Sequence, residues 1–515
     1  MRPDGEARLA VVDLGSNSFR LVVFSSHAAV PGGLGSWWKR TDEIYEPVRI
    51  GAGMDETGAL GEDGIARAIA AITVFAHFCE AAGLTPGEVD AVATSAIREA
   101  SNSASFLQRA RAASGLPVRV LSREEEARCG YLAAINSTDL RDGAVLDLGG
   151  GSMQLVHVAG RHQLDVDSWR LGAVRMTERF LPGDEPQSAK ALGRLREHVL
   201  RKLERADWLA GCGARIVGVG GTVRNLAATA QRMDDVPEFG VQGFLIERAV
   251  LDELVEHLAR VPVAERARTP GIKPARADIV LAGAVVVQSV LEAGGFAGIE
   301  ATEAGLREGV FFERTLTGGD GPLFDDVRRA SVLNLAAQYD PHAAHTRHVA
   351  GLALGLFDQL AAAGVHAGDP AERELLWAAC LLHDVGVVVD YDDHHKHSRY
   401  LILNTGLPGF APREVALIGQ VVRYHRKGMP ALGPFEALAQ PGDDALLDRC
   451  AVLLRLGEDL ERSRDQIVRE VRAHAAGDAV RLELVADGDA TVPRWAAARE
   501  VELFARAFGR RLEVV

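Results

Sequence analysis

The sequence predicts an α/β protein of two similar lobes, followed by an all-α domain and a small C-terminal α/β cap. Two observations predict this order. An apolar strand that ends in Asp and a Gly- or Ser-rich turn occurs twice, at 10–23 (AVVDLGSNSFRLVV) and at 144–156 (AVLDLGGGSMQLV). After 317–326 the composition changes to helix-forming residues with many histidines. A chain of 515 residues has room for three or four domains.

The two copies of strand and turn form an internal repeat. Aligned on Asp13 and Asp147, they share Ala, Val, Asp, Leu, Gly, a later Ser and a closing Leu-Val. Each copy predicts a β-hairpin, because a short β-rich run leads through a tight turn into a returning strand. Alanine-rich helices are predicted at 64–82, 102–113 and 188–210. The recurrence predicts lobes near 1–128 and 129–313, with a site in the cleft between them.

The rest of the chain is predicted to form two further parts. Residues 320–470 are expected to make the helical domain. Residues 471–515 are expected to make the cap, which should run strand, helix, strand through AVRLELVA, TVPRWAAAREVELFARAF and RRLEVV.

Composition limits the class of protein and its partners. The formal net charge of −14 argues against bulk nucleic-acid binding, which needs a basic face. The N-terminal MRPDGEARLA lacks an apolar signal core, and the longest strongly apolar stretch, 279–287, is too short to span a bilayer. The five cysteines are scattered without a CxxC pair. We therefore expect a cytoplasmic protein with reduced thiols that binds neither nucleic acid nor membrane.

The glycine-rich turns predict a site for phosphate and Mg²⁺. Without Cβ atoms, successive backbone N–H groups can form an anion nest, and a carboxylate at the strand end, Asp147 or Asp13, can hold Mg²⁺, with Mn²⁺ as the alternative. A third turn lies at 217–227 (VGVGGTVRNLA). A glycine turn alone can simply close a hairpin, but three turns, two of them in register with Asp, favour the phosphate site. The predicted phosphate-binding residues are Ser16, Asn17, Ser18, Gly149, Gly150, Gly151, Ser152, Gly220, Gly221 and Thr222.

These motifs resemble the phosphate motifs of the actin-like ATPase superfamily, whose lobes are ribonuclease H-like. Within it, the chain resembles the exopolyphosphatase/guanosine pentaphosphate phosphatase family over nearly its whole length. The matching segments are DLGSNSFRLVV, TSAIREASN, LSREEEARCGYLAA, EAGLREGVFFE and VVRYHRKGMP. The resemblance implies hydrolytic removal of a terminal phosphate from a phosphoanhydride chain.

The resemblance assigns the catalytic glutamate to Glu126, with Glu125 as its near neighbour. Without the resemblance, the acidic run would be interpreted as a solvated helix N-terminus, where glutamates interact favourably with the helix dipole. Arg98 is expected to direct its guanidinium at phosphate oxygens, although alone it could equally be a surface residue. Arg123 stands where relatives usually have glycine, so it either adds a phosphate contact or alters the turn of the catalytic loop.

The helical domain resembles the HD metallophosphohydrolase superfamily. The resemblance implies a second metal site of His345, His383, Asp384 and Glu458, which replaces the usual aspartate, with His395 and His397 as further candidate ligands. Imidazole and carboxylate together suit divalent transition metals. Because the related family often carries this domain in degraded form, a structural role, metal binding and independent catalysis all stay open.

A basic segment in the same domain, RYHRKGMP, gathers Arg423, His425, Arg426 and Lys427. It is read either as a solvated helix end or as a track for a long anionic chain.

Together these features predict a Mg²⁺-dependent exopolyphosphatase that releases orthophosphate from inorganic polyphosphate, and a homodimer is expected. The alternatives are a guanosine pentaphosphate 5′-phosphatase, a regulator that binds guanosine alarmone without turnover, and a sugar or acetate kinase. Glu126 favours an enzyme over the regulator, and the family-specific segments outside the phosphate turns weigh against the kinase.

Overall fold

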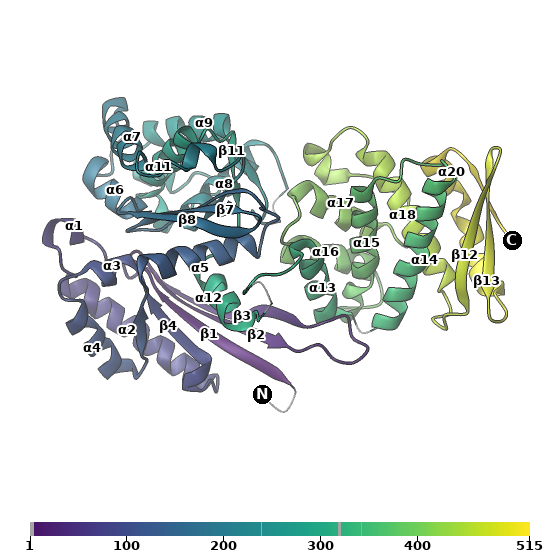
Figure 1. Cartoon of the computed structure of the whole chain (residues 1–515), viewed down its shortest axis with the longest axis horizontal. Coiled ribbons are helices and arrows are strands. Elements are labelled where there is room, and N and C mark those ends of the chain that lie inside the picture. Colours follow the sequence, from purple (N-terminus) through teal and green to yellow (C-terminus); the bar gives the residue numbers. More distant parts are fainter. Residues whose placement is uncertain (1–4, 238, 318–320, 341) are drawn as a thin grey trace. The chain divides into compact units, whose positions relative to one another are not determined.

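The structure is a computed structural model that describes residues 5–237, 239–317, 321–340 and 342–515. It divides into two compact units. The first, which we call the repeat unit, comprises residues 1–27, 38–235 and 241–327; the second, the helical unit, comprises 28–37, 236–240 and 328–515. Figure 1 labels their elements.

The first sheet of the repeat unit has five strands in the order β3-β2-β1-β4-β5. Its strands are β1 (Glu6–Leu14), β2 (Phe19–His27), β3 (Trp37–Glu46), β4 (Val89–Ala93) and β5 (Val118–Val120). Strand β1 pairs antiparallel with β2 and parallel with β4. We call this sheet and the helices α1 to α4 lobe I.

The second sheet has six strands in the order β10-β11-β9-β6-β7-β8. Its strands are β6 (Gly143–Leu148), β7 (Met153–Ala159), β8 (His162–Trp169), β9 (Ile216–Val219), β10 (Leu245–Glu247) and β11 (Gly298–Ala301). Strand β6 pairs antiparallel with β7 and parallel with β9, as β1 does with β2 and β4. This sheet and the helices α6 to α11 form lobe II.

The hairpins of the two lobes are built alike, which confirms the predicted α/β class and its duplicated lobes. Asp13 pairs with Arg20 across the first hairpin, and Asp147 pairs with Gln154 at the equivalent position of the second. The turns close with the same backbone hydrogen bond, from Gly15 N to Ser18 O at 3.2 Å and from Gly149 N to Ser152 O at 3.0 Å.

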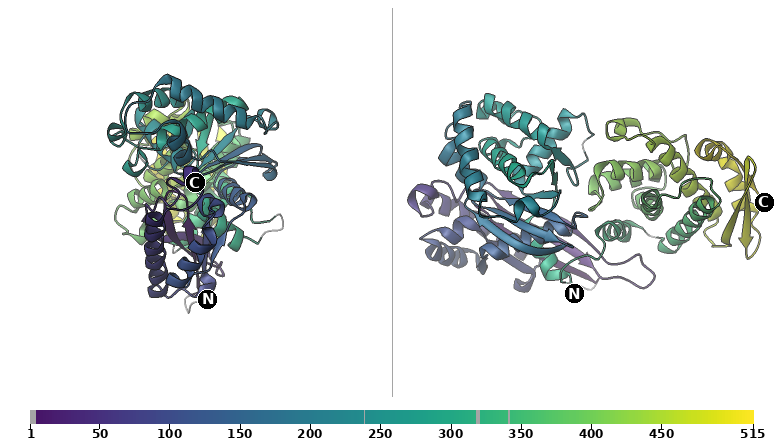
Figure 2. Two further views of the ribbon diagram at one scale, coloured as in Figure 1. Left: turned by 90° about the vertical axis from the view of Figure 1, so that its left-hand side faces the viewer. Right: turned by 45° about the horizontal axis from the view of Figure 1, so that its top comes forward.

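The helices of the repeat unit cover both sheets, as Figures 1 and 2 show from different sides. They are α1 (Met54–Thr57), α2 (Glu62–Ala81), α3 (Ser95–Glu99), α4 (Ser103–Ser114), α5 (Arg123–Ile135), α6 (Ala173–Phe180), α7 (Ala189–Leu203), α8 (Gly221–Met233), α9 (Arg248–Arg260), α10 (Val263–Arg266), α11 (Val280–Gly294) and α12 (Leu306–Thr315). By length and composition, α2 alone among the described helices could cross a membrane, yet Ile65, Ile72 and Phe75 bury it against the core of lobe I.

Two helices, α5 and α12, cross between the lobes. Helix α5 packs Leu132 and Ile135 onto the core of lobe II, whereas α12 packs Phe311 and Phe312 onto the face of the first sheet that carries Leu9, Val11, Val22 and Phe24. The chain thus leaves lobe I through α5 and returns to it through α12. Figure 1 shows α5 running between the two sheets.

Helix α7 ends at Leu203, earlier than the predicted 210. Beyond it the chain turns, and Trp208 stacks on His157 of β7 at 5.3 Å while its Nε1 donates a hydrogen bond to Asp167 of β8 at 3.1 Å. A tertiary contact with the sheet therefore stops a segment whose composition alone favours helix.

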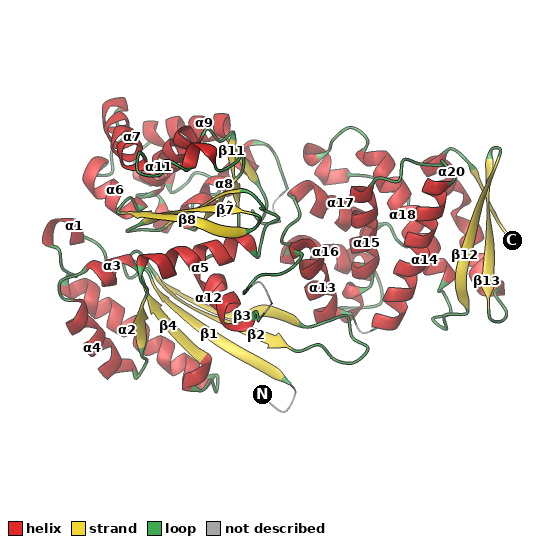
Figure 3. Cartoon of the chain, in the orientation of Figure 1, coloured by secondary structure: helices red, strands yellow, loops and turns green. Residues whose placement is uncertain are grey.

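The helical unit, coloured by element type in Figure 3, packs its helices around one apolar core. They are α13 (Val327–Tyr339), α14 (Ala343–Ala362), α15 (Pro370–Leu382), α16 (His394–Thr405), α17 (Pro412–Arg423), α18 (Asp443–Leu460), α19 (Thr491–Ala497) and α20 (Val501–Phe508). A sheet of β12 (Val468–Ala476), β13 (Ala479–Ala486) and β14 (Arg511–Val514) follows. We predicted β13 and β14 but missed β12, most of whose residues are polar or alanine.

Helices α14 and α18 approach each other closely at Gly457. A Cβ atom there would lie 2.9 Å from the carbonyl oxygen of Val349, closer than atoms can pack without movement of the backbone. The glycine therefore sets the spacing of two helices that carry predicted metal ligands, His345 and Glu458.

Candidate active site

The turns of both lobes meet at a cavity of about 120 Å³. Of the residues predicted for the first site, those that line it are Asp13, Ser16, Asn17, Ser18, Glu126, Asp147, Gly149, Gly150, Ser152, Gly220 and Gly221. The repeat thus brings its two Asp-turn motifs to face one cavity, together with the third turn.

Close backbone packing explains why two of these turns are glycine-rich. A Cβ atom at Gly151 would lie 2.8 Å from Ser16 Oγ and 2.7 Å from Ser95 Oγ, so glycine lets the second turn pack against lobe I. Gly220 has φ 109°, and a Cβ there would lie 2.6 Å from Leu148 O. Larger residues at either position would push apart the turns that form the cavity.

Of the residues predicted in the three turns, Gly151 and Thr222 do not line the cavity. The Thr222 side chain is buried, and its Cγ2 would lie 2.5 Å from a Cβ at Gly283 of α11. Thr222 therefore packs α8 against α11 and supports the turn from behind.

Glu126 lies in the first turn of α5 and is 6% exposed. Its Oε1 accepts a hydrogen bond from Ser152 Oγ at 3.1 Å, and its Oε2 accepts one from Arg98 Nη1 at 2.7 Å. A buried carboxylate is thus held between the turn of lobe II and an arginine of lobe I, at the wall of the cavity.

Arg98 contacts the glutamate instead of lining the cavity. The same Nη1 donates to Leu121 O at 2.9 Å, and no described residue accepts a hydrogen bond from its buried Nε and Nη2. In the structure Arg98 is hydrogen-bonded to Glu126, and its expected contact with phosphate oxygens stays a prediction.

Glu125 and Arg123 have their contacts outside the cavity. The Glu125 side chain accepts a hydrogen bond from the backbone N–H of Ser122 at 2.7 Å, and Ser122 Oγ accepts one from Glu125 N at 3.1 Å, which makes a capping box for α5. Arg123 lies 3.8 Å from Glu99. Of the acidic run, only Glu126 lines the cavity.

Asp13 and Asp147 stand at equivalent strand ends and both line the cavity. Burial, with smaller effects of the Glu126 and Asp13 carboxylates, raises the pKa of Asp147 to about 7. Burial also raises the pKa of Asp13. Gly130 of α5 makes room for Asp147, because a Cβ there would lie 2.7 Å from its Oδ2. Two carboxylates that are costly to ionise without a nearby cation fit the oxygen ligands that Mg²⁺ prefers.

Four arginines that we did not predict also line the cavity: Arg20, Arg224, Arg276 and Arg307. Burial and the neighbouring Arg307 lower the pKa of Arg224 to about 10. The pKa values of Arg20 and Arg276 are lowered by burial and by a neighbouring arginine. Since these like charges repel one another, an anion bound between them would be strongly favoured. Arg20, Arg224 and Arg307 stand in the quoted motifs, whereas Arg276 lies in a segment without a motif.

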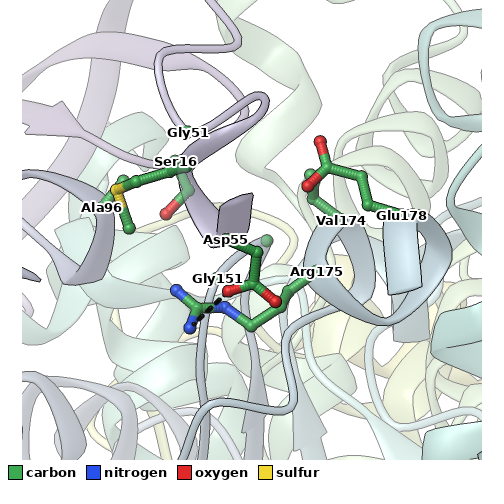
Figure 4. Close-up of a pocket in the computed structure, with 10 residues that line it drawn as sticks. Ser16, Gly51, Asp55, Ala96, Gly151, Val174, Arg175 and Glu178 are labelled. Carbon is green, nitrogen blue, oxygen red and sulfur yellow. Dashed lines mark ion pairs between the residues drawn. The ribbon is translucent and has the colours of Figure 1, made fainter. Parts of the chain in front are cut away.

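Ion pairs join the lobes at one edge of this cleft. Figure 4 shows Arg175 of α6 paired with Asp55 of α1, at 2.9 Å. Arg175 also pairs with Glu99 of α3 at 3.1 Å, and Glu178 accepts a hydrogen bond from Gly53 N at 3.3 Å. These contacts hold the lobes against each other beside the phosphate turns.

The residues predicted for the second metal site also come together, in the helical unit. His345, His383 and Glu458 form one group of adjacent ligand atoms, and Asp384 belongs to a second group, with His394 and His425. His395 is buried nearby, and His397 joins neither group.

The basic segment is not a continuous exposed track. His425 is 2% exposed and contacts other histidines, whereas Lys427 is exposed. Arg423 and Arg426 are half-buried and lie over the rings of Tyr424 and Tyr391.

The fold and the cleft define a protein of two actin-like lobes whose turns enclose a cationic, carboxylate-bearing cavity. Comparison with family models gives the particular family: the model described as Ppx/GppA phosphatase family matches residues 41–317, and that described as Ppx/GppA phosphatase, domain III, matches 327–492. The chain belongs to the Ppx/GppA phosphatase family, and this membership implies a phosphoanhydride hydrolase.

Individual relatives agree with this membership. A guanosine-5'-triphosphate,3'-diphosphate pyrophosphatase of Vibrio vulnificus is 29% identical over 96% of this chain and 95% of its own length. A solved Ppx/GppA family member from Aquifex aeolicus is 29% identical, with a TM-score of 0.50, over 59% of this chain and 96% of its own. An exopolyphosphatase from Cytophaga hutchinsonii, at 21% identity, shares the fold with a TM-score of 0.54 over 60% of this chain and 97% of its own.

Proposed function

We propose that the chain is an exopolyphosphatase, which hydrolyses the terminal phosphoanhydride bond of inorganic polyphosphate and releases orthophosphate. The observation that carries this proposal is the buried Glu126 carboxylate at the wall of a cavity formed by three glycine-containing turns and lined by four arginines. A carboxylate beside an anion site is what activation of water for attack on phosphorus requires.

In the proposed reaction, Glu126 accepts a proton from water as the water oxygen bonds to the terminal phosphorus. The bridging P–O bond then breaks, and the shortened chain leaves with its negative charge on the former bridging oxygen. Ser152 and Arg98 hold Glu126 in place through their hydrogen bonds of 3.1 and 2.7 Å. The backbone N–H groups of the turns and the cavity arginines bind the non-bridging oxygens and stabilise the charge that develops on them.

Asp147 and Asp13 are the residues that would hold Mg²⁺ in this cavity, since both line it at equivalent strand ends. A bound Mg²⁺ supplies charge neutralisation for the phosphate oxygens.

Guanosine pentaphosphate is the second candidate substrate. The Vibrio vulnificus relative, which this chain matches over 96% of its residues, is named for that compound. The 5′ end of guanosine pentaphosphate is also a linear phosphoanhydride. The same cavity could therefore bind it, and Glu126 could activate water for its hydrolysis.

Phosphate release from the purified full-length protein tests both candidates. We expect Mg²⁺-dependent release from long-chain polyphosphate that exceeds release from guanosine pentaphosphate at equal concentrations of chain ends. The reverse preference would favour the second candidate. Tight binding of guanosine pentaphosphate with no release from either compound would contradict the enzyme and favour the regulator.

A further inference from the structure

An acidic residue of β3 pairs with two of the arginines that line the cleft. Glu43 lies on β3, the strand next to β2 in the first sheet, and Arg20 lies near the start of β2 (Figure 1). Arg20 Nη1 donates a hydrogen bond to Glu43 Oε1 at 2.7 Å. Arg307 Nη1 lies 3.8 Å from the same oxygen. One carboxylate therefore neutralises part of the positive charge that the cavity offers to an anion.

Glu43 lies outside the cavity itself. The described residues that line the cavity include Arg20 and Arg307 but not Glu43. The Glu43 side chain is 40% exposed, whereas those of Arg20 and Arg307 are 19% and 7% exposed. The carboxylate therefore covers the two guanidinium groups from the solvent side, and water can solvate it when another anion takes its place.

Arg307 has hydrogen-bond donors that Glu43 does not satisfy. Arg307 is 6% exposed, and its Nε and Nη1 make no hydrogen bond to any described residue. The distance of 3.8 Å from Nη1 to Glu43 is too long for a hydrogen bond. A buried donor without an acceptor is costly, so an anion that came closer than Glu43 would be favoured.

Basic residues continue from the cavity toward solvent. Arg276 lines the cavity, and its guanidinium packs on Gly221, where a Cβ atom would collide with it. Lys273 lies earlier in the same segment and is exposed. Partial burial and the neighbouring Arg20 lower the pKa of Lys273, whereas Glu43 has the opposite effect. Lys273 therefore lies close to both members of the Arg20–Glu43 pair.

The segment that carries Lys273 and Arg276 is fixed to the third turn. Lys273 N donates a hydrogen bond to Asn225 Oδ1 at 2.7 Å, and Asn225 Nδ2 donates one to Gly221 O at 2.6 Å. Asn225 is 4% exposed, so its amide is held on both sides inside the protein. A buried side chain that bridges two segments in this way keeps the basic segment beside the cavity.

We infer that Arg20, Arg307 and Lys273 form a second anion subsite, which binds a phosphate of the leaving chain. Glu43 occupies this subsite until that phosphate displaces its carboxylate. The inference rests on the proposed function, in which the terminal phosphate binds at the turns beside Glu126. The ligand is a linear chain of linked phosphates, because Glu126, Arg20 and Arg307 line one cavity. Glu43 therefore sets how tightly the chain binds and takes no part in bond cleavage.

Calorimetric titration of the full-length protein with tripolyphosphate tests the subsite, with chelator present so that no turnover occurs. Glu43→Gln should tighten binding about tenfold, because the ligand no longer displaces a charged acceptor from Arg20. Orthophosphate, which fills the inner position alone, should bind the parent and the variant with similar affinity. Unchanged tripolyphosphate affinity in the variant, or equal tightening for both ligands, would overturn the subsite.

The matched control is Asp42→Asn, which removes the same charge from the same strand. Asp42 is exposed and precedes Glu43 in β3, so its side chain points to the opposite face of the sheet. We expect no change in tripolyphosphate affinity. Tightening as large as that of Glu43→Gln would show that net charge and not the Arg20 pair controls binding, which would contradict the inference.

A double variant tests whether the effect depends on Arg20. Arg20→Gln should weaken tripolyphosphate binding, and addition of Glu43→Gln should then tighten it by much less than in the parent, because the pair is already broken. An undiminished gain in the double variant would mean that Glu43 acts on another group, and the subsite would be refuted.

Kinetics with Mg²⁺ separate this inference from the proposed function. Glu43→Gln should lower KM for tripolyphosphate about tenfold and leave kcat unchanged, because the lost contact is made only outside the reacting phosphate. Phosphate release from neither candidate substrate, with Glu43-dependent binding retained, would refute the proposed function and support the subsite. Normal release with binding that does not depend on Glu43 would refute the subsite alone.

Discussion

The cleft of the repeat unit and the histidine centre of the helical unit both gather charged and polar groups inside the protein, but they use different chemical groups to do so. The cleft uses backbone turns, arginines and carboxylates, which suit phosphate and Mg²⁺. The histidine centre, which is the buried cluster of His345, His383, Asp384, His394, His425 and Glu458, contains three imidazoles whose Nδ1 atoms lie at backbone carbonyls. Imidazoles held in this way suit transition metals. Both leave polar groups that need a ligand: repelling arginines in the first, imidazoles and carboxylates in the second.

The two regions also differ in how their residues are encoded. Each turn of the cleft is contiguous in sequence, and the two Asp-turns each close through one backbone hydrogen bond. Each group of the histidine centre takes its three ligands from three different helical segments. Local motifs therefore identify the cleft, whereas only helix packing assembles the histidine centre.

The largest effect should come from Glu126→Gln, which breaks the chemistry of the cleft alone. We expect kcat for phosphate release to fall on the order of 10²–10⁴-fold with the fold retained, because the general base is lost. Steady-state kinetics on polyphosphate measure it. Glu125→Gln is the matched control: it keeps the capping box of α5 and should keep kcat. Near-normal kcat in the Glu126→Gln variant would show that Glu126 is not the general base.

Removal of one cavity arginine should have the next largest effect. We expect Arg224→Gln to lower kcat/KM by about 10- to 100-fold, since a hydrogen bond to a charged group contributes about 1.5–3 kcal/mol. The control is Arg215→Gln, an arginine that is 44% exposed and pairs with Asp139 and Glu300. Equal kinetics for the two variants would argue against an anion site in the cleft.

Asp147→Asn should raise the Mg²⁺ concentration required for half-maximal activity, about tenfold if the lost charge is worth about 1.4 kcal/mol. Asp13→Asn should act in the same direction but more weakly. Mg²⁺ titrations of both variants measure this difference between the lobes. An unchanged Mg²⁺ requirement in both variants would show that neither aspartate binds the Mg²⁺ ion.

The pKa of Asp147 predicts how stability depends on pH without metal. Because the folded-state pKa is about 7 and the ordinary value is 3.8, the folded state holds this proton more tightly than the unfolded state. The free energy of unfolding of chelator-treated protein should therefore decrease as pH rises between these values. Urea titrations should show a flatter dependence for Asp147→Asn, and the same dependence in both proteins would refute the assignment.

The smallest effect on phosphate release is expected from His383→Gln. Every residue that lines the proposed active site belongs to the repeat unit, so kcat should be unchanged if the protein folds. Kinetics together with circular dichroism decide the matter. A folded variant without polyphosphate hydrolysis would overturn our placement of the active site and show that the two regions act together.

Much of the cleft could be predicted from sequence because its chemistry lies in short local motifs. The Asp-turn repeat predicted both hairpins, and the structure pairs Asp13 and Asp147 at equivalent positions. The resemblance to the family identified Glu126 among three adjacent glutamates, and helix geometry explains the choice: Glu125 caps α5, whereas Glu126 is buried beside Ser152.

Several features that sequence missed depend on contacts between distant segments. Helix α7 ended early because of a contact with the sheet at Asp167, and Arg276 reaches the cavity from a segment without a motif. Similarly, the ion pair of Arg98 with Glu126 depends on how α5 packs beside α3, and the expected contact of Arg98 with phosphate stays a prediction.

The sequence by itself determined the repeat, the order of the parts and the residue types of both sites, because hydrophobic patterns and turn residues act over a few positions. Tertiary structure alone decided that His425 lies beside His394 and Asp384. The reason is physical: which side chains meet depends on how helices pack, and close contacts such as that of Gly457 with Val349 are set by the whole core of the helical unit.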